Sequence, residues 1–145
     1  IAIAADARIG PGLVRFNVLH LESTLTALEI RDAQAEEVAV DAEPVTHPVI
    51  TGGDFNTFFY FDDIDKGDIR EPAVNSFLDR GHIDAHEDIA LEERYTSTDP
   101  FPQVIDLIFV RRAEVLEAGR CAPERCGALS DHLPVFARIR PRPGE

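Results

Sequence analysis

The sequence has no methionine, no tryptophan, a single lysine (Lys66) and only two cysteines among its 145 residues. Two cysteines are too few for a scaffold built on disulfides. No apolar run approaches the ~20 residues of a membrane-spanning helix, so we expect no membrane span. Basic residues are also scarce: 14 stand against 27 acidic ones, and the net charge is −13. This charge argues against a coat for duplex nucleic acid, because phosphates need a positive surface.

The rest of the composition is that of an ordinary globular protein, with 44% hydrophobic and 28% charged residues. Residues 1–8 and 13–20 are apolar-rich strand candidates, and the Gly and Pro residues between them predict a hairpin. Ser23 is the expected N-cap of a helix that runs to about residue 40. The apolar residues of this helix recur at nearly helical spacing and predict one packing face, formed by Leu25, Leu28, Ala35 and Val38.

The remaining elements alternate between strands and helices. In order, we expect a short strand at 49–50 ending at Gly52-Gly53, a helix at 72–80, strands at 104–110 and 113–118, a loop at 119–132 and a final strand at 133–140. Gly81 is the expected C-cap of the second helix. Such alternation predicts an α/β fold. No linker divides the chain, so we expect residues 1–140 to belong to a single domain, followed by a tail at 141–145.

Four sets of polar residues lie at the ends of these apolar strands, where rigid elements aim side chains into a site. The sets are His20, Asp54 with Asn56, Asp106, and Asp131 with His132. Taken singly, each is a weak signal. His20 is compatible with a structural hydrogen bond, Asp54 with an Asx turn, and Asp106 with a buried ion pair.

The same residue types also suit chemistry. A carboxylate such as Asp106 can orient a histidine, as in catalytic triads. Asp131 is a hard oxygen donor suited to a divalent cation. His132 can act as an acid, a base or a hydrogen-bond donor to phosphate.

Together and in order, the four sets resemble the motifs of the endonuclease/exonuclease/phosphatase superfamily, the deoxyribonuclease-I-like metal-dependent phosphoesterases. The motifs are His20-Leu21, Gly53-Asp54-Phe55-Asn56, Ile105-Asp106-Leu107-Ile108-Phe109 and Ser130-Asp131-His132-Leu133-Pro134-Val135. Arg31 and Gln34 also look like the R-x-x-Q of many members. The resemblance covers residues 1–139 and implies a four-layered α/β sandwich, in which two facing sheets are flanked by helices.

The resemblance implies a role for each of these residues in hydrolysis of a phosphodiester or phosphomonoester by in-line attack of water. Asp54 would activate the water and, with Asp131, bind the metal, while Asn56 would hold Asp54 and bond a phosphate oxygen. Asp106 would steer His132, which would bind the phosphoryl group and assist proton transfer. His20 would donate to a phosphate oxygen. Oxygen ligands favour Mg²⁺ or Mn²⁺ as the cofactor. The substrate is a phosphate ester, and the charge does not favour nucleic acid among the candidates.

One departure from the family pattern lies at the start of the chain. Members carry an Asn and a metal-binding Glu before the histidine motif, whereas the only carboxylate before His20 is Asp6. Since methionine is also absent, we expect this chain to be the second half of the sandwich, processed or truncated at its start. A lone half would expose apolar surface, so we expect the missing N-terminal half, or self-association, to cover it. A catalytically incomplete binding or scaffold module of the same fold is the alternative function.

Four further features keep two interpretations each. The acidic run at 63–68 is a solvated loop or a faint calcium loop. His82 and His86 lie in a surface loop, or bind metal at helical spacing. Cys121 and Cys126 form a disulfide, implying an extracytoplasmic protein, or stay reduced in the cytoplasm. The arginines before Asp131 (Arg111, Arg112, Arg120 and Arg125) contact an approaching phosphate or lie at a solvated edge.

Overall fold

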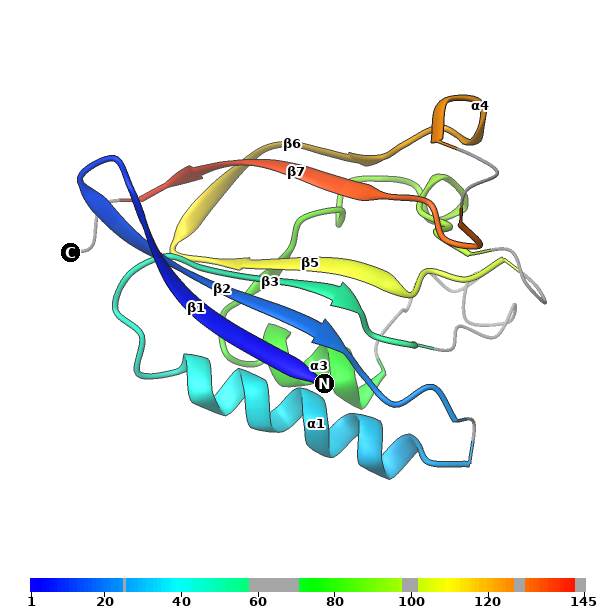
Figure 1. The fold of residues 1–145 in the computed structure, drawn as a ribbon, viewed down its shortest axis with the longest axis horizontal. Coiled ribbons are helices and arrows are strands. Elements are labelled where there is room, and N and C mark those ends of the chain that lie inside the picture. Colours follow the sequence, from blue (N-terminus) through cyan, green and yellow to red (C-terminus); the bar gives the residue numbers. More distant parts are fainter. Residues whose placement is uncertain (25, 58–70, 98–101, 127–129, 143–145) are drawn as a thin grey trace.

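The computed structural model describes residues 1–24, 26–57, 71–97, 102–126 and 130–142. At its centre lies a five-stranded mixed sheet in the order β1-β2-β3-β5-β4 (Figure 1). The strands are β1 (Ala2–Ile9), β2 (Gly12–His20), β3 (Val49–Asp54), β4 (Ile83–Asp84) and β5 (Asp106–Arg111). Only β2 and β3 are parallel, and the other neighbouring pairs of this sheet are antiparallel.

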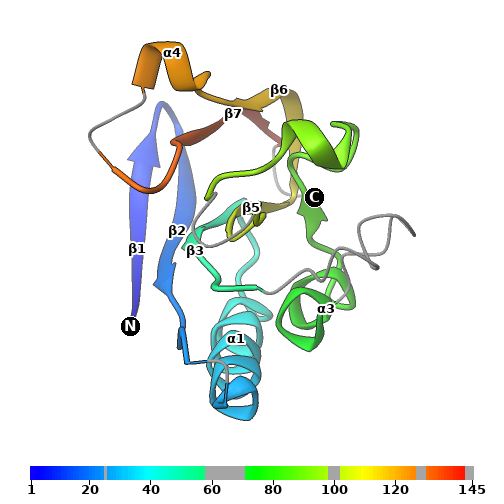
Figure 2. The ribbon, with the colours of Figure 1, turned by 90° about the vertical axis from the view of Figure 1, so that its right-hand side faces the viewer.

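Helices cover one face of the sheet and a second, two-stranded sheet covers the other (Figures 1 and 2). The helices are α1 (Leu28–Ala42) and α3 (Pro72–Leu78), which contact each other. The second sheet pairs β6 (Ala113–Arg120) with β7 (Val135–Pro141). Two short helices, η1 (Leu91–Glu93) and α4 (Pro123–Cys126), lie in the connections. This arrangement is the α/β fold with a mixed sheet and flanking helices that the sequence predicts.

The core between the sheet and the helices is built around three phenylalanines from different elements. The rings of Phe77 on α3 and Phe109 on β5 are stacked with their centroids 5.1 Å apart. Phe55, just after β3, meets both rings edge-on at 5.6 and 5.3 Å. All three side chains are fully buried, and each such burial contributes roughly 1.5–3 kcal/mol. Because Phe55 is anchored here, the residues beside it have a fixed position.

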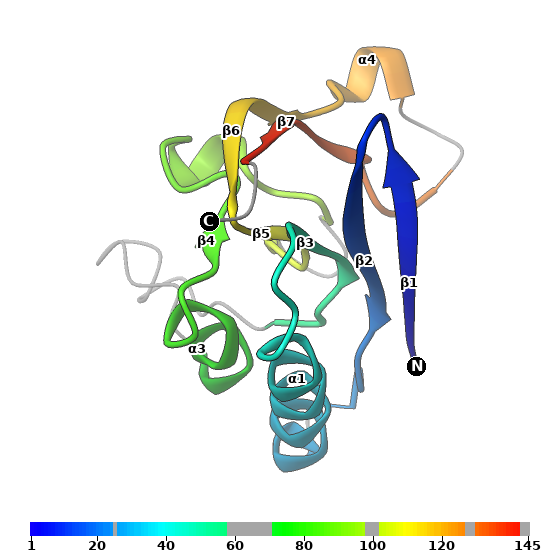
Figure 3. The same ribbon diagram turned by 90° about the vertical axis from the view of Figure 1, so that its left-hand side faces the viewer.

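Most of the predicted elements are confirmed, with boundaries shifted by a few residues. The predicted hairpin is present, since β1 and β2 pair along their whole length through a turn at Gly10 (Figure 3). The strand expected at 104–110 is Asp106–Arg111, and the last strand is Val135–Pro141. The loop expected at 119–132 also contains the short helix α4.

The start of the first long helix was predicted wrongly. Ser23 does not cap it; α1 begins at Leu28, after Ala27, and no side chain caps it. The backbone N–H of Thr24 instead donates to Glu22 at 2.9 Å, which holds this segment outside the helix. The predicted face is confirmed at Ala35, which is fully buried, and at Val38, which packs against the core, but not at Leu28, which is 42% exposed; Leu25 lies outside the described residues. The buried positions of α1 are Arg31, Ala35, Ala39 and Ala42.

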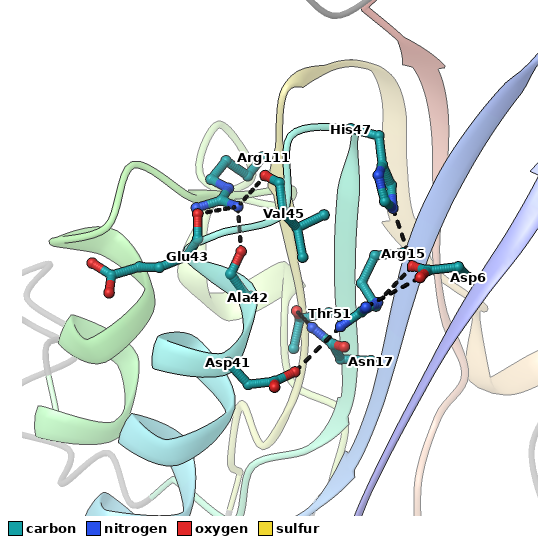
Figure 4. Close-up of polar contacts among 10 residues, drawn as sticks. All are labelled: Asp6, Arg15, Asn17, Asp41, Ala42, Glu43, Val45, His47, Thr51 and Arg111. Atoms are coloured by element: carbon teal, nitrogen blue, oxygen red, sulfur yellow. Dashed lines mark hydrogen bonds and ion pairs between the residues drawn. The ribbon is translucent and has the colours of Figure 1, made fainter.

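Charged side chains fasten α1 and the hairpin to the sheet at the end opposite the predicted site (Figure 4). Arg111, at the end of β5, donates to the carbonyls of Ala42 and Val45, the latter at 3.0 Å. A cation is favourable there because the last carbonyls of a helix lack partners within it. Arg15 donates to Asp6 at 2.6 Å and to Asp41 on α1 at 3.2 Å. Arg111 therefore has a structural role, and the expectation that it meets a phosphate is wrong.

Cys121 and Cys126 form a disulfide across α4, which decides between the two expected states of these residues. None of the helices in the described part of the chain is long and apolar enough to cross a membrane.

Candidate functional site

Strand register brings three of the predicted residues together at one edge of the sheet. In the parallel pair, His20 at the end of β2 lies beside Asp54 at the end of β3. In the antiparallel pair, Asp54 lies opposite Asp106, the first residue of β5. His20 Nε2 is 3.7 Å from Asp54 Oδ2, and the His20 side chain is 65% exposed. His20 and Asp54 are 34 positions apart in the chain, and Asp54 and Asp106 are 52 positions apart. The strand pairing thus brings distant residues into one polar surface next to solvent.

Gly53 permits the close contact between β2 and β3 at this edge. Its φ is 143°, and a Cβ at this position would lie 2.0 Å from the carbonyl oxygen of Leu19. No other residue type can be accommodated there without displacing the backbone of β2. Gly53 therefore sets the spacing between His20 and Asp54.

The fourth predicted residue, His132, joins the site from the loop before β7. Its Nδ1 is 2.9 Å from Oδ2 of Asp106, and both side chains are partly exposed, at 30% and 17%. A carboxylate at Nδ1 fixes the orientation of the ring and directs Nε2 outwards. The contact between these two residues agrees with the steering role that the resemblance implies for Asp106.

Asp54 is the most strongly perturbed carboxylate of the site. Burial raises its pKa above the ordinary value, and the charge of Asp106 raises it further. A hydrogen bond from the backbone N–H of Asn56 to Oδ1, at 2.8 Å, and the nearby His132 and His20 lower it in part. A carboxylate whose pKa is raised accepts a proton more readily, which suits a group that activates water.

Asn56 contacts Asp54 through its backbone N–H, which donates to Oδ1 at 2.8 Å. Its φ of 50° is unusual for a residue other than glycine. The side-chain amide donates to the carbonyl of Leu21 at 3.0 Å. The buried Arg31 donates to the carbonyl of Asn56 and to Glu71, the latter at 2.7 Å. Arg31 thus fixes the turn that carries the site.

The second residue of the R-x-x-Q pattern has a similar role. Gln34 Oε1 accepts the backbone N–H of Glu22 at 2.8 Å, which fixes the chain just after His20. Both residues of the pattern therefore connect α1 to loops that follow the strands of the site.

No protein-family model matches the sequence, and neither does any curated protein. Solved structures do match. An endonuclease/exonuclease/phosphatase from Beutenbergia cavernae DSM 12333 superposes with a TM-score of 0.74 at 18% identity, over 99% of this chain and 40% of that one. D. rerio TDP2 complexed with a single-strand DNA product gives 0.67 at 20% identity, over 96% and 61%. The human Nocturnin catalytic domain with bound sulfate gives 0.68 at 19% identity, over 95% and 52%.

The chain has the endonuclease/exonuclease/phosphatase fold. It spans between 40% and 61% of the length of these three neighbours. The expectation that the chain corresponds to part of a larger fold unit agrees with these shares.

The two residues expected to bind a metal, Asp54 and Asp131, are less well assembled than the rest of the site. Asp131 is exposed on the loop before β7, and its Oδ1 contacts Ser130 Oγ at 3.4 Å. Within the described ranges, three or more His, Cys, Asp or Glu side chains do not gather as a metal-binding group. Asp54 and Asp131 have the right chemistry for Mg²⁺, because both offer hard oxygen atoms. Two carboxylates can hold Mg²⁺ when water supplies its remaining ligands, so Asp54 and Asp131 fit such an ion chemically.

Several expectations outside the site are corrected. His82 and His86 are not on a surface loop: they are 3% and 4% exposed. His86 contacts Asp84 and the carbonyl of Gly119, whereas neither ring nitrogen of His82 has a hydrogen-bond partner. Arg120 donates to the carbonyl of Tyr95 at 2.7 Å, so it too is structural. The acidic run at 63–68 lies outside the described residues.

One residue of the site has no counterpart among the predicted ones. Thr96 is fully buried and contacts the chain segments that carry Asp106 and His132. Nothing in the sequence around it distinguishes it from an ordinary buried threonine.

Proposed function

We propose that the full-length protein is a metal-dependent phosphoesterase that hydrolyses a phosphodiester or a phosphomonoester. The observation that carries this proposal is the convergence of His20, Asp54, Asp106 and His132 at one sheet edge in this fold. The named neighbours add support, since one holds a DNA product and another holds sulfate, a tetrahedral anion like phosphate.

Each residue has its own role in the proposed in-line displacement at phosphorus. Asp54 takes a proton from the attacking water, whose oxygen forms the new bond to phosphorus as the bond to the leaving oxygen breaks. The exposed His20 donates a hydrogen bond to a phosphoryl oxygen, where negative charge accumulates. His132, whose Nδ1–H is held by Asp106, donates from Nε2 when its ring carries both protons, and passes that proton to the leaving oxygen. Mg²⁺ or Mn²⁺, when bound through Asp54 and Asp131, would supply further stabilisation of that charge.

The charge of the chain bears on the class of phosphate ester that it would bind. The net charge of −13 weighs against tight, sequence-independent binding of duplex DNA. A small phosphate ester or a short single strand needs fewer positive contacts. The Cys121–Cys126 disulfide supports an oxidising, extracytoplasmic compartment for the protein.

We further propose that the remainder of a larger fold unit covers the outer hairpin in the full-length protein. Ile1, Ile3 and Val18 are 83%, 65% and 59% exposed, and Ile3 pairs with Val18 across β1 and β2. Contiguous exposed apolar side chains are typical of surfaces that contact protein. The neighbours are longer chains, which favours a covering segment over a second copy.

The test of the catalytic proposal is turnover of a chromogenic phosphodiester by the full-length protein with Mg²⁺ and after chelation. We expect activity only with the metal, and a loss of roughly 10²–10⁴-fold in His132→Ala, the range for a lost general acid or base. His47→Ala, at the opposite end of β3, is the matched control and should keep its activity. Full activity of His132→Ala would contradict the proposal.

A binding or scaffold module without catalysis is the second candidate. The small number of assembled metal ligands within the described residues favours it. It predicts no metal-dependent turnover by the full-length protein and unaltered partner binding in His132→Ala.

A further inference from the structure

Thr96 lies at the junction of the two segments that carry the Asp106–His132 pair. Its side chain is fully buried. The hydroxyl oxygen, Oγ1, accepts the backbone N–H groups of Ile105 at 3.3 Å and of Asp106 at 3.2 Å. One side-chain atom thus holds the point where β5 begins and fixes the backbone from which the Asp106 carboxylate projects.

The main chain of Thr96 holds the other member of the pair. Its carbonyl accepts the backbone N–H of Leu133, directly after His132, at 2.7 Å. Its N–H donates to the carbonyl of Gln103 at 2.9 Å, and the neighbouring Ser97 forms isolated bridges with both Gln103 and His132. Thr96 therefore joins residues that lie between 7 and 37 positions away from it in the chain.

We propose that Thr96 is a positioning residue, whose hydroxyl sets the distance between Asp106 and His132. This inference rests on the proposed function of the site, because it assigns Thr96 to the same reaction. The 2.9 Å contact between His132 Nδ1 and Asp106 Oδ2 joins two separate segments, and neither is held in place by that contact alone. Without the hydroxyl, the N–H groups of Ile105 and Asp106 lose a buried acceptor, so the start of β5 moves to find another.

A second buried threonine provides a control that distinguishes a positioning role of the hydroxyl from a packing role. Thr51, in the middle of β3, is also fully buried, and its Oγ1 accepts a hydrogen bond from the side chain of Asn17 at 3.0 Å (Figure 4). Thr51→Val therefore removes the same chemical group from another fully buried position, where the hydroxyl does not bond the segments of Asp106 or His132. Both Val variants keep the shape of the side chain and lose one buried hydroxyl.

The experiment is an NMR measurement of the tautomer of His132 in the full-length protein without substrate, read from its two ring ¹⁵N shifts. In the wild type, the carboxylate of Asp106 keeps the proton on Nδ1. We expect Thr96→Val to shift the neutral ring towards the Nε2–H form, and Thr96→Ser and Thr51→Val to keep the wild-type tautomer. If Thr96→Val does not fold, Thr96→Ala and Thr96→Ser give the same comparison, because they differ only by the hydroxyl.

Turnover gives the second readout. We expect kcat of Thr96→Val to fall roughly 10- to 100-fold with KM little changed, since small displacements of catalytic groups act on the transition state. A wild-type tautomer in Thr96→Val or Thr96→Ala, or an equal change in Thr96→Ser, would overturn the inference. Failure of the proposed function is distinguishable, because the protein would then lack turnover while the tautomer still responded to Thr96.

Discussion

The two carboxylates that face each other at the sheet edge differ because their surroundings differ. Burial raises the pKa of Asp54, whereas Asp106 contacts the imidazole of His132 at 2.9 Å. Pairs of carboxylates in unlike environments are the usual way in which one site obtains two chemical roles. Here a single register, between β3 and β5, creates the pair.

At the scale of the residue, His82 predicts how stability depends on pH. Burial, with Arg111 and Arg80 nearby, lowers its pKa to about 4 from 6.5. The folded protein therefore keeps His82 neutral, while the unfolded chain protonates it below about pH 6.5. This contribution to stability is present above pH 6.5 and is lost as pH falls towards 4, in total about 2–3 kcal/mol.

Urea unfolding at a series of pH values checks this prediction. His82→Leu removes the titration, and its stability relative to the wild type should rise as pH falls from 7 to 4. Carboxylates elsewhere affect both proteins alike and cancel in the difference. A difference that stays constant with pH would show that His82 does not titrate in this way.

The residues of the site were predictable where a charge interrupts an apolar strand pattern. Asp106 stands out because a carboxylate in such a context needs a partner, whereas Asp54 was found through its Gly53-Asp54-Phe55-Asn56 motif. Thr96 could not be predicted, because its role depends on backbone groups of residues distant in sequence, and a threonine is unremarkable in either setting. The backbone hydrogen bond from Asn56 to Asp54 could not be predicted either, because it depends on the positive φ of Asn56.

At the scale of the element, strands were more predictable than helix α1. The β1–β2 hairpin has apolar strands and a turn at Gly10, and these signals are local. The buried face of α1 consists of alanines and Arg31, whose hydrophobicity gives almost no periodic signal. Small alanines let the helix approach the sheet closely, and Arg31 reaches through to Asn56. Packing partners decide this face, and the sequence of the helix alone does not contain them.

The disulfide across α4 should stabilise the connection that leads to Asp131 and His132. Cys121 also donates its backbone N–H to the carbonyl of Pro134 at 2.7 Å, so the loop is fastened at both of its sides. Loop-closure entropy for so short a loop amounts to roughly 2 kcal/mol. We expect Cys121→Ser with Cys126→Ser to lower the free energy of unfolding by about that amount.

Urea unfolding with and without a reductant measures this effect, and the double variant should not respond to the reductant. Equal midpoints for the wild type in both conditions, with the bond shown to be reduced by mass spectrometry, would contradict the prediction.

At the scale of the whole molecule, two properties oppose each other. The net charge of −13 keeps copies apart, whereas the exposed residues Ile1, Ile3 and Val18 favour association. The isolated 145-residue chain should therefore associate more strongly as salt screens the charge. The net charge follows from the composition. The position of the apolar patch formed by Ile1, Ile3 and Val18 does not, because it depends on which strand lies at the edge of the sheet.

Sedimentation of this chain at low and high salt tests whether the apolar patch causes association. We expect the average mass to rise with salt in the wild type and to stay monomeric in Val18→Glu. Leu116→Glu, at an apolar position of β6 in the second sheet that is 37% exposed, adds the same charge away from the hairpin and should behave like the wild type. Equal effects of the two variants would mean that the hairpin has no special part in association.

The central claim is that the sheet edge around Asp54 hydrolyses phosphate esters. Asp54→Asn tests it most directly, because the amide keeps the shape of the side chain and an oxygen that can accept the Asn56 N–H, and removes only the charge. Asp41→Asn, in an exposed ion pair with Arg15, is the matched control.

The measurement is Mg²⁺-dependent turnover of a phosphodiester by the full-length protein, with thermal unfolding of each variant. We predict that Asp54→Asn loses at least about 100-fold in turnover while remaining as stable as the wild type or more so, since burial already disfavours the charged form. Wild-type turnover by Asp54→Asn would contradict the account.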